Sequence, residues 1–208
     1  MKDLDIQAVP GREVSEAVFL NNLRMATGEK HKMLESQGLL AALMSPEVTM
    51  DHYTTHLSLM QTIHQVFEQQ LLPQLSILFP DKESILMSGL ISDDLRFLGG
   101  SHAGFLPAAY ALPVKTPSLA YALGFLYVLE GSKLGGKVIF KHLQKTLGIS
   151  GEEGGKYLTD NGANTGSNWK RFLGVFAEYV TARQLEEEAI AGANDAFTSI
   201  YTYYQSNT

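Results

Sequence analysis

The sequence has no cysteine, few charged residues and no long apolar run. The absence of cysteine excludes disulfides, thiolate metal sites and cysteine nucleophiles, and it agrees with a reducing cytoplasm. A formal net charge of −6 argues against a nucleic-acid binder, which would need a basic face. The longest apolar run, residues 119–129, is too short to cross a bilayer, and the polar start MKDLDIQAVPG has no signal-peptide core. We therefore expect a soluble cytoplasmic protein that binds neither nucleic acid nor membrane.

Most local signatures of catalysis are also missing. The chain contains no phosphate-binding GxxxxGK[ST], no GxGxxG, no GxSxG and no HExxH motif. The ExxH motif of di-iron carboxylate bundles is absent as well. The segment EGSKLGG, residues 130–136, is glycine-rich, but it lies inside a predicted helix and does not follow a strand, so it is not a phosphate loop.

Helical periodicity dominates what remains, and no alternating pattern long enough for a sheet is present. Ser45–Pro46 and Thr116–Pro117 are good helix starts, and Gly148 is a good helix end. The pattern predicts a single all-α domain over residues 18–208, with residues 1–17 as an N-terminal extension. The predicted helices are 15–36, 45–72, 75–78, 82–89, 93–98, 116–148, 168 to past 188, and 195–204, with a long loop between Gly148 and Asn168.

His31 and Glu35 lie four residues apart in LRMATGEKHKMLE, so they share one face of the first predicted helix. A metal-bound imidazole commonly donates its second N–H to a carboxylate, which fixes the tautomer. His31 is therefore a candidate metal ligand, with Glu35 holding its other nitrogen. The alternative is an exposed His–Glu pair without function, and the spacing alone favours that alternative.

A second group of histidines follows on the next helix. His52 and His56 are four residues apart, and His64 and Glu68 repeat that spacing. Such pairs invite a metal interpretation. Because polar residues surround them and no ExxH motif accompanies them, we expect a solvated helix face instead.

Three glycines interrupt the apolar helix LYVLEGSKLGGKVIF, residues 126–140: Gly131, Gly135 and Gly136. Each glycine in a helix interior costs about 1 kcal/mol relative to alanine. Gly131 and Gly135 are four apart and clear one strip of the helix of side chains. Either another helix packs closely against that strip or a flat ligand lies on the bare backbone, and the spacing alone favours helix packing.

Taken together, LRMATGEKHKMLE and the later LEGSKLGGKV resemble the two halves of a heme oxygenase site. The segment LFPDKESILMSGLISDDLRFLG is similar to that family's Phe-Pro and Asp-Leu segment, and NWKRFLGVF to its penultimate basic helix. The resemblance covers residues 18–204. The serine after Gly131 is most similar to the bacterial members that supply biliverdin to bacteriophytochromes.

The resemblance implies a helical fold that holds heme b between the first helix and the glycine-rich distal helix. It places His31 at the proximal iron ligand and Glu35 at the carboxylate behind it. Basic side chains would meet the heme propionates. The heme-binding positions that it implies are Arg24, Thr27, His31, Glu35, Gly131, Ser132, Gly135, Gly136, Lys170 and Arg171, of which His31, Gly131, Ser132 and Gly135 would also be catalytic.

The activity implied by the resemblance is oxidative cleavage of heme to biliverdin with release of CO and ferrous iron. Heme is then both substrate and cofactor. The other reactants are O2 and electrons from a separate donor, such as a ferredoxin with its reductase or ascorbate. A functional link to a bacteriophytochrome is also implied.

Two departures from the family pattern matter. Many members carry an aspartate where this chain has Ser132, and that aspartate anchors the waters that relay protons, so Glu130 or water would have to compensate. Gly28 and Gly174 stand where other members often have basic residues, which leaves fewer charges for the propionates. The missing aspartate favours an alternative function, a non-catalytic heme-binding protein that stores, senses or carries heme. A purely structural helical protein is the third possibility.

Overall fold

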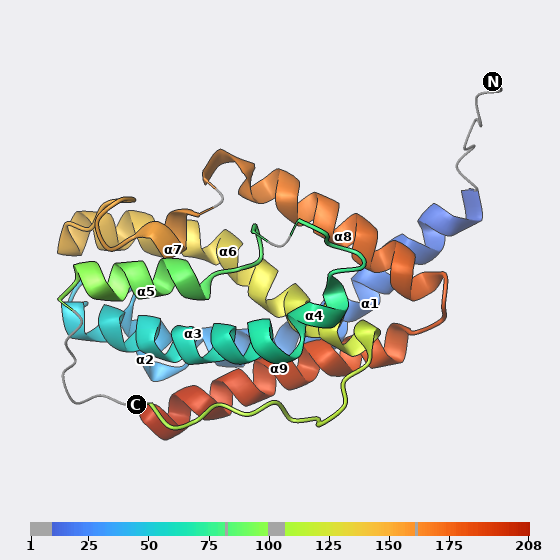
Figure 1. The fold of residues 1–208 in the computed structure, drawn as a ribbon, viewed down its shortest axis with the longest axis horizontal. Coiled ribbons are helices and arrows are strands. Elements are labelled where there is room, and N and C mark those ends of the chain that lie inside the picture. The colour runs from blue at the N-terminus through green and yellow to red at the C-terminus, as the bar shows by residue number, and fades with distance from the viewer. Residues whose placement is uncertain (1–9, 82, 100–106, 161) are drawn as a thin grey trace.

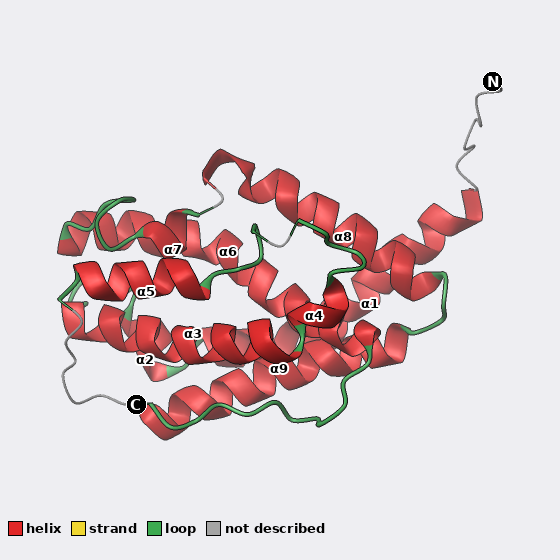
Figure 2. Cartoon of the chain, in the orientation of Figure 1, coloured by secondary structure: helices red, strands yellow, loops and turns green. Residues whose placement is uncertain are grey.

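The computed structural model describes residues 10–81, 83–99, 107–160 and 162–208. These residues form helices joined by loops, with no β-strand among them, which confirms the predicted all-α fold (Figure 2). None of the helices in these ranges combines the length and the apolar character that crossing a bilayer requires. The helices are α1 (Pro10–Glu35), α2 (Gly38–Ala42), α3 (Met50–Gln70), α4 (Leu72–Leu75), α5 (Ser88–Phe97), α6 (Leu119–Leu147), α7 (Lys156–Thr159), the 3-10 helix η1 (Gly162–Asn164), α8 (Thr165–Thr181) and α9 (Glu186–Asn207).

Helix α6 lies at the centre of the fold, and α9 crosses it in the most extensive helix pairing of the molecule (Figure 1). Helix α1 packs against α9 and α8, while α3 pairs with α5. Two glycines make the α6–α9 crossing close. A Cβ atom on Gly124 would lie 1.9 Å from the carbonyl oxygen of Ala189, and one on Gly192 would lie 2.1 Å from that of Tyr121.

The helix ends follow local capping chemistry, although not always at the predicted residue. Helix α3 starts after Thr49, whose side chain accepts the N–H of His52 at 3.2 Å, and not at Ser45 as predicted. Helix α6 starts after Ser118, whose hydroxyl accepts the N–H of Tyr121 at 3.2 Å, and not at Thr116. Gly148 ends α6 in the left-handed conformation, with φ of 74°, as predicted.

The predicted division of the C-terminal region is wrong. Helix α8 ends at Thr181, and a single helix then runs from Glu186 to Asn207. Gln184 makes the turn between them with φ of 57°, a left-handed conformation in a residue other than glycine. The turn reverses the chain, so that α9 runs back across α6 (Figure 1). No glycine or proline marks this position in TARQLEEE, so periodicity alone predicts an unbroken helix.

The prediction of a solvated face for the α3 histidines is also wrong for two of the three. His56 is 5% exposed and His64 is 2% exposed, while His52 lies at the surface. The Tyr204 hydroxyl from α9 lies 2.9 Å from Nδ1 of His56, and His64 contacts Tyr157 of α7. Burial lowers the pKa of His56 to about 4 and that of His64 to about 3. Both imidazoles are therefore neutral near pH 7.

Candidate functional site

His31 lies near the end of α1, and its ring contacts the side chains of Glu35 and Phe197. Its Nδ1 lies 3.3 Å from Oε2 of Glu35, and its ring meets that of Phe197 edge to face, with ring centroids 5.6 Å apart. The His31 side chain is nevertheless 55% exposed. Because Nδ1 is engaged by the carboxylate, Nε2 is the nitrogen available to a ligand.

No group of three or more His, Asp or Glu side chains among the described residues could hold a metal ion. A metal bound at His31 would have to bring its other ligands with it, as a porphyrin does.

Helices α1 and α6 meet at Thr27 and Tyr127. Burial raises the pKa of the Tyr127 phenol, and the Arg24 charge and the Thr27 side chain oppose that rise. Thr27 itself is buried, and its hydroxyl donates to the carbonyl of Leu23 at 2.8 Å. The two helices run in the same general direction (Figure 1).

His31 and Gly131 each lie one helical turn beyond the Thr27–Tyr127 contact. The bare strip of α6 begins there. A Cβ atom on Gly131 would lie 3.6 Å from the Trp169 ring of α8, whereas one on Gly135 would have no neighbour within 4 Å. Gly136 faces the other way, toward Leu158. No helix among the described residues packs on Gly135, so the helix-packing interpretation that spacing favours does not describe that position.

Ser132 lies between these glycines and is exposed. Its hydroxyl donates to the carbonyl of Leu129 at 2.7 Å, and Ser132 opposes the rise that burial causes in the pKa of Tyr157. Tyr157 belongs to the short helix α7, which Asp94 holds in place. The Asp94 carboxylate accepts the N–H of Tyr157 at 2.8 Å and that of Lys156 at 2.9 Å.

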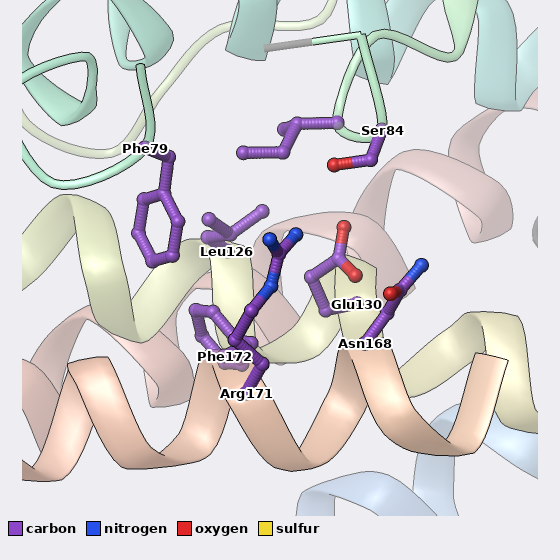
Figure 3. Close-up of a pocket in the computed structure, with 8 residues that line it drawn as sticks. Phe79, Ser84, Leu126, Glu130, Asn168, Arg171 and Phe172 are labelled. Atoms are coloured by element: carbon purple, nitrogen blue, oxygen red, sulfur yellow. The ribbon is translucent and has the colours of Figure 1, made fainter. Parts of the chain in front are cut away.

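Glu130 directly precedes the first glycine of the strip on α6. Its carboxylate lies 2.7 Å from Lys133 Nζ, and the lysine also donates to the carbonyl of Ser84 at 2.7 Å. Burial raises the pKa of Glu130, and Lys133 and Arg171 oppose the rise. Figure 3 shows Glu130 and Arg171 on the walls of one small cavity. The cavity is lined by Phe79, Ser84, Ile85, Leu126, Glu130, Asn168, Arg171 and Phe172.

The three basic side chains predicted to meet the propionates differ in their surroundings. Arg24 is exposed on α1 beside the Thr27–Tyr127 contact. Lys170 is exposed on α8, while its neighbour Arg171 lies in the cavity with Glu130. Arg24 and Lys170 are therefore free to meet an anionic group in solvent, and Arg171 has a carboxylate nearby already.

The sequence did not predict that two residues, Tyr157 and His64, belong to this region. Tyr157 falls in the segment predicted as a loop, and His64 is on the α3 face predicted to be solvated. The only signal for them is local. The two residues KY after Gly155 begin a helical turn, and that turn is too short to show a period.

Comparison with known proteins identifies the family to which this chain is similar. Residues 17–205 match the sequence model of one family, described as heme oxygenase. A heme oxygenase of Xanthomonas campestris is 32% identical over 54% of this chain, and the match spans 63% of that protein's own length. The heme oxygenase PigA of Pseudomonas aeruginosa is 29% identical over 84% of this chain and 85% of its own.

Solved structures show the same fold. The NO- and CO-bound heme oxygenase of Neisseria meningitidis has a TM-score of 0.75 and 26% identity, with 91% of each chain covered. Heme oxygenase-1 of the cyanobacterium Synechocystis, solved in complex with heme, has a TM-score of 0.69 at 15% identity and covers 90% of this chain and 91% of that one, which is a likeness of fold alone. The fold is that of a helical heme-degrading enzyme. The chain belongs to the heme oxygenase family.

Proposed function

We propose that this protein binds heme between α1 and α6 with His31 as the axial iron ligand, and that it cleaves the bound heme to biliverdin, CO and iron. The observation that carries the proposal is the His31–Glu35 pair one turn beyond the α1–α6 contact. On α6, Gly131 lies one turn beyond the same contact, and the surface is open one turn further on, at Gly135. Heme serves as both substrate and cofactor, and it supplies the iron at which O2 reacts.

The residues present suit a heme. A porphyrin needs one protein ligand for its iron, and His31 offers Nε2 while Glu35 holds Nδ1. The porphyrin also needs a flat surface on the other side. Gly135 offers that surface, because it has no side chain and no described residue covers its backbone.

Each surrounding residue has a distinct role in this proposal. Glu35 orients the His31 ring and makes its free nitrogen a better ligand. Gly131 and Gly135 keep side chains away from the distal face and leave room for a second reactant. Arg24 and Lys170 provide cations for the propionates, while Ser132 holds water on the distal side. O2 and an external electron donor, a ferredoxin with its reductase or ascorbate, complete the reaction.

A hemin titration followed by turnover tests the proposal. Hemin added to the purified protein should produce a Soret band at one equivalent. Ascorbate or a ferredoxin and its reductase, in air, should then remove that band while biliverdin absorbance rises. A Soret band that survives reduction in air would contradict catalysis and support the non-catalytic heme-binding alternative.

The ligand assignment has its own control. His31→Ala should weaken heme binding or abolish turnover, whereas His52→Ala should change neither, because His52 lies at the exposed start of α3 and only caps that helix. Equal behaviour of the two variants would show that His31 is not the ligand. The link to bacteriophytochromes is tested by adding an apo-bacteriophytochrome to the turnover mixture and watching for assembly of its pigment.

A further inference from the structure

The two side chains that contact the His31 ring differ in how firmly they are held. The Glu35 side chain is 69% exposed, and its Oε2 lies 3.3 Å from Nδ1 of His31. Phe197 of α9 is only 5% exposed, and its ring meets the imidazole edge to face, with ring centroids 5.6 Å apart and an angle of 72° between the ring planes. The imidazole therefore lies between one solvated carboxylate and one buried ring.

The carboxylate alone does not fix the direction of the imidazole plane. An exposed pair of side chains four residues apart on a helix stabilises little, because water competes for both partners and holding two long side chains in one geometry costs entropy. A single hydrogen bond at Nδ1 also leaves the ring free to turn about the line that joins the nitrogen to the oxygen. Glu35 therefore selects which nitrogen is free for a ligand, but it does not decide which way the ring faces.

Phe197 is suited to fix that direction because packing sets its own position. It belongs to the hydrophobic core together with Ala193 and Ile200 of the same helix. A side chain in a close-packed core cannot turn without displacing its neighbours. Two aromatic rings also attract one another in the edge-to-face arrangement, since the positive edge of one ring meets the negative face of the other. The phenyl ring thus offers the imidazole one preferred plane.

Helix α9 is anchored to both helices of the proposed site. Gly192 lies so close to α6 that a Cβ atom on it would stand 2.1 Å from the carbonyl oxygen of Tyr121. Two residues later, the carbonyl of Asn194 accepts a hydrogen bond from Lys30 Nζ of α1 at 3.4 Å. Phe197 follows about one turn after Asn194 and meets His31, the residue next to Lys30. Helix α9 thus connects the crossing with α6 to the contact with His31.

We propose that Phe197 is a positioning residue that fixes the plane of the His31 imidazole, while Glu35 fixes which of its nitrogens is free. With Nδ1 engaged and the plane held, Nε2 points in one direction before a ligand arrives. A ligand group that is already oriented loses less conformational freedom on binding, so affinity is gained without a new contact. The consequence for heme rests on the proposed function, whereas the contact between the two rings does not.

The ring contact can be tested by NMR without heme. In the apo protein, nuclear Overhauser effects should connect the ring protons of His31 with those of Phe197, and a His31→Gln variant identifies the histidine signals. In Phe197→Leu, the His31 ring protons should lose the ring-current shift that the phenyl ring causes. If no Overhauser effect joins the two rings in the wild type, the proposal is overturned.

The consequence for the site is tested with heme bound to Phe197→Leu, which keeps an apolar side chain but removes the ring. The Kd for heme should rise by roughly 2- to 10-fold, the range expected for loss of one aromatic pair. In the ferric cyanide complex, the hyperfine shifts of the heme methyl protons depend on the direction of the axial imidazole plane, so their pattern should change. The Fe–His stretching band of the ferrous complex should broaden, because the imidazole then samples several directions.

Tyr203→Leu is the matched control on the same helix. Tyr203 is similarly buried and packs edge to face against Tyr110, with ring centroids 5.2 Å apart. Its loss should destabilise the fold at least as much, because its hydroxyl also donates to the carbonyl of Ala108, yet the methyl shifts and the Fe–His band should equal those of the wild type.

The outcomes separate this proposal from the proposed function. If Phe197→Leu has wild-type spectra, or if Tyr203→Leu changes them in the same way, the positioning role is refuted. Wild-type protein that binds no hemin would refute the proposed function instead, and the Overhauser effects in the apo protein would still decide whether Phe197 holds the His31 ring.

Discussion

Gly124 of α6 lies so close to Ala189 of α9 that a Cβ atom on it would stand 1.9 Å from the Ala189 carbonyl oxygen. Gly135, eleven residues further along the same helix, has no atom within 4 Å of the same hypothetical Cβ. The two glycines are alike in local sequence terms, both lying inside one helix. One permits helix packing and the other keeps a surface bare.

Alanine at these two positions should therefore have opposite effects on the apo protein. Gly124→Ala should destabilise it by about 2 kcal/mol or more, because backbone atoms must move to admit the methyl group. Gly135→Ala should stabilise it by up to about 1 kcal/mol through better helix propensity. Urea unfolding measures both. A loss of stability in Gly135→Ala would mean that the position is packed and not open.

A larger side chain at Gly135 tests the proposed distal surface. Gly135→Leu should leave the apo fold intact yet weaken heme binding by roughly 10- to 100-fold, the effect of overpacking a close contact. Hemin titration measures it. Lys141→Leu introduces the same side chain at an exposed position later on α6 and should bind heme as the wild type does. Equal affinities of the two variants would exclude heme from the Gly135 surface.

Arg24 is predicted to assist heme binding through its charge. Arg24→Ala should raise the Kd for heme by roughly 3- to 10-fold at low salt, and the difference should shrink as ionic strength rises. Lys32→Ala is the control on the same helix, because Lys32 is exposed and its Nζ lies 3.1 Å from Glu29. An equal effect of both variants would assign the loss to general charge and not to a propionate contact.

Stability should fall on acidification because His56 and His64 are buried in the neutral form. Their folded pKa values, about 4 and about 3, lie below the unfolded value of 6.5, so the unfolded chain binds more protons as pH drops below that value. Each histidine should cost about 2 kcal/mol of unfolding free energy between pH 6.5 and 5. Urea unfolding at pH 7 and pH 5 measures the loss.

Substitution separates this effect from other titrations. His64→Gln should lower stability at pH 7 but reduce the difference between pH 7 and pH 5. His52→Gln, at a position that is only partly buried, should leave that difference as it is in the wild type. An unchanged difference in His64→Gln would show that His64 is not buried neutral.

Much of the protein could be predicted because the relevant signals are local. Periodicity of 3.6 residues indicated the long helices, and the spacing of His31 and Glu35 placed both on one turn. The segment from Thr181 to Glu186 could not be predicted in this way, because no glycine or proline marks the reversal at Gln184. The close approach of α9 to α6 selects that turn.

The sequence by itself determined the all-α class, the His31–Glu35 pair and the bare strip on α6, since each depends on residues within a few turns of one helix. Only the tertiary structure decided which glycines admit another helix and which stay open, and that His56 and His64 are buried against Tyr204 and Tyr157. Those facts depend on which helix covers which face. Those contacts join elements that are far apart in the chain, and the spacing of residues within one element does not predict them.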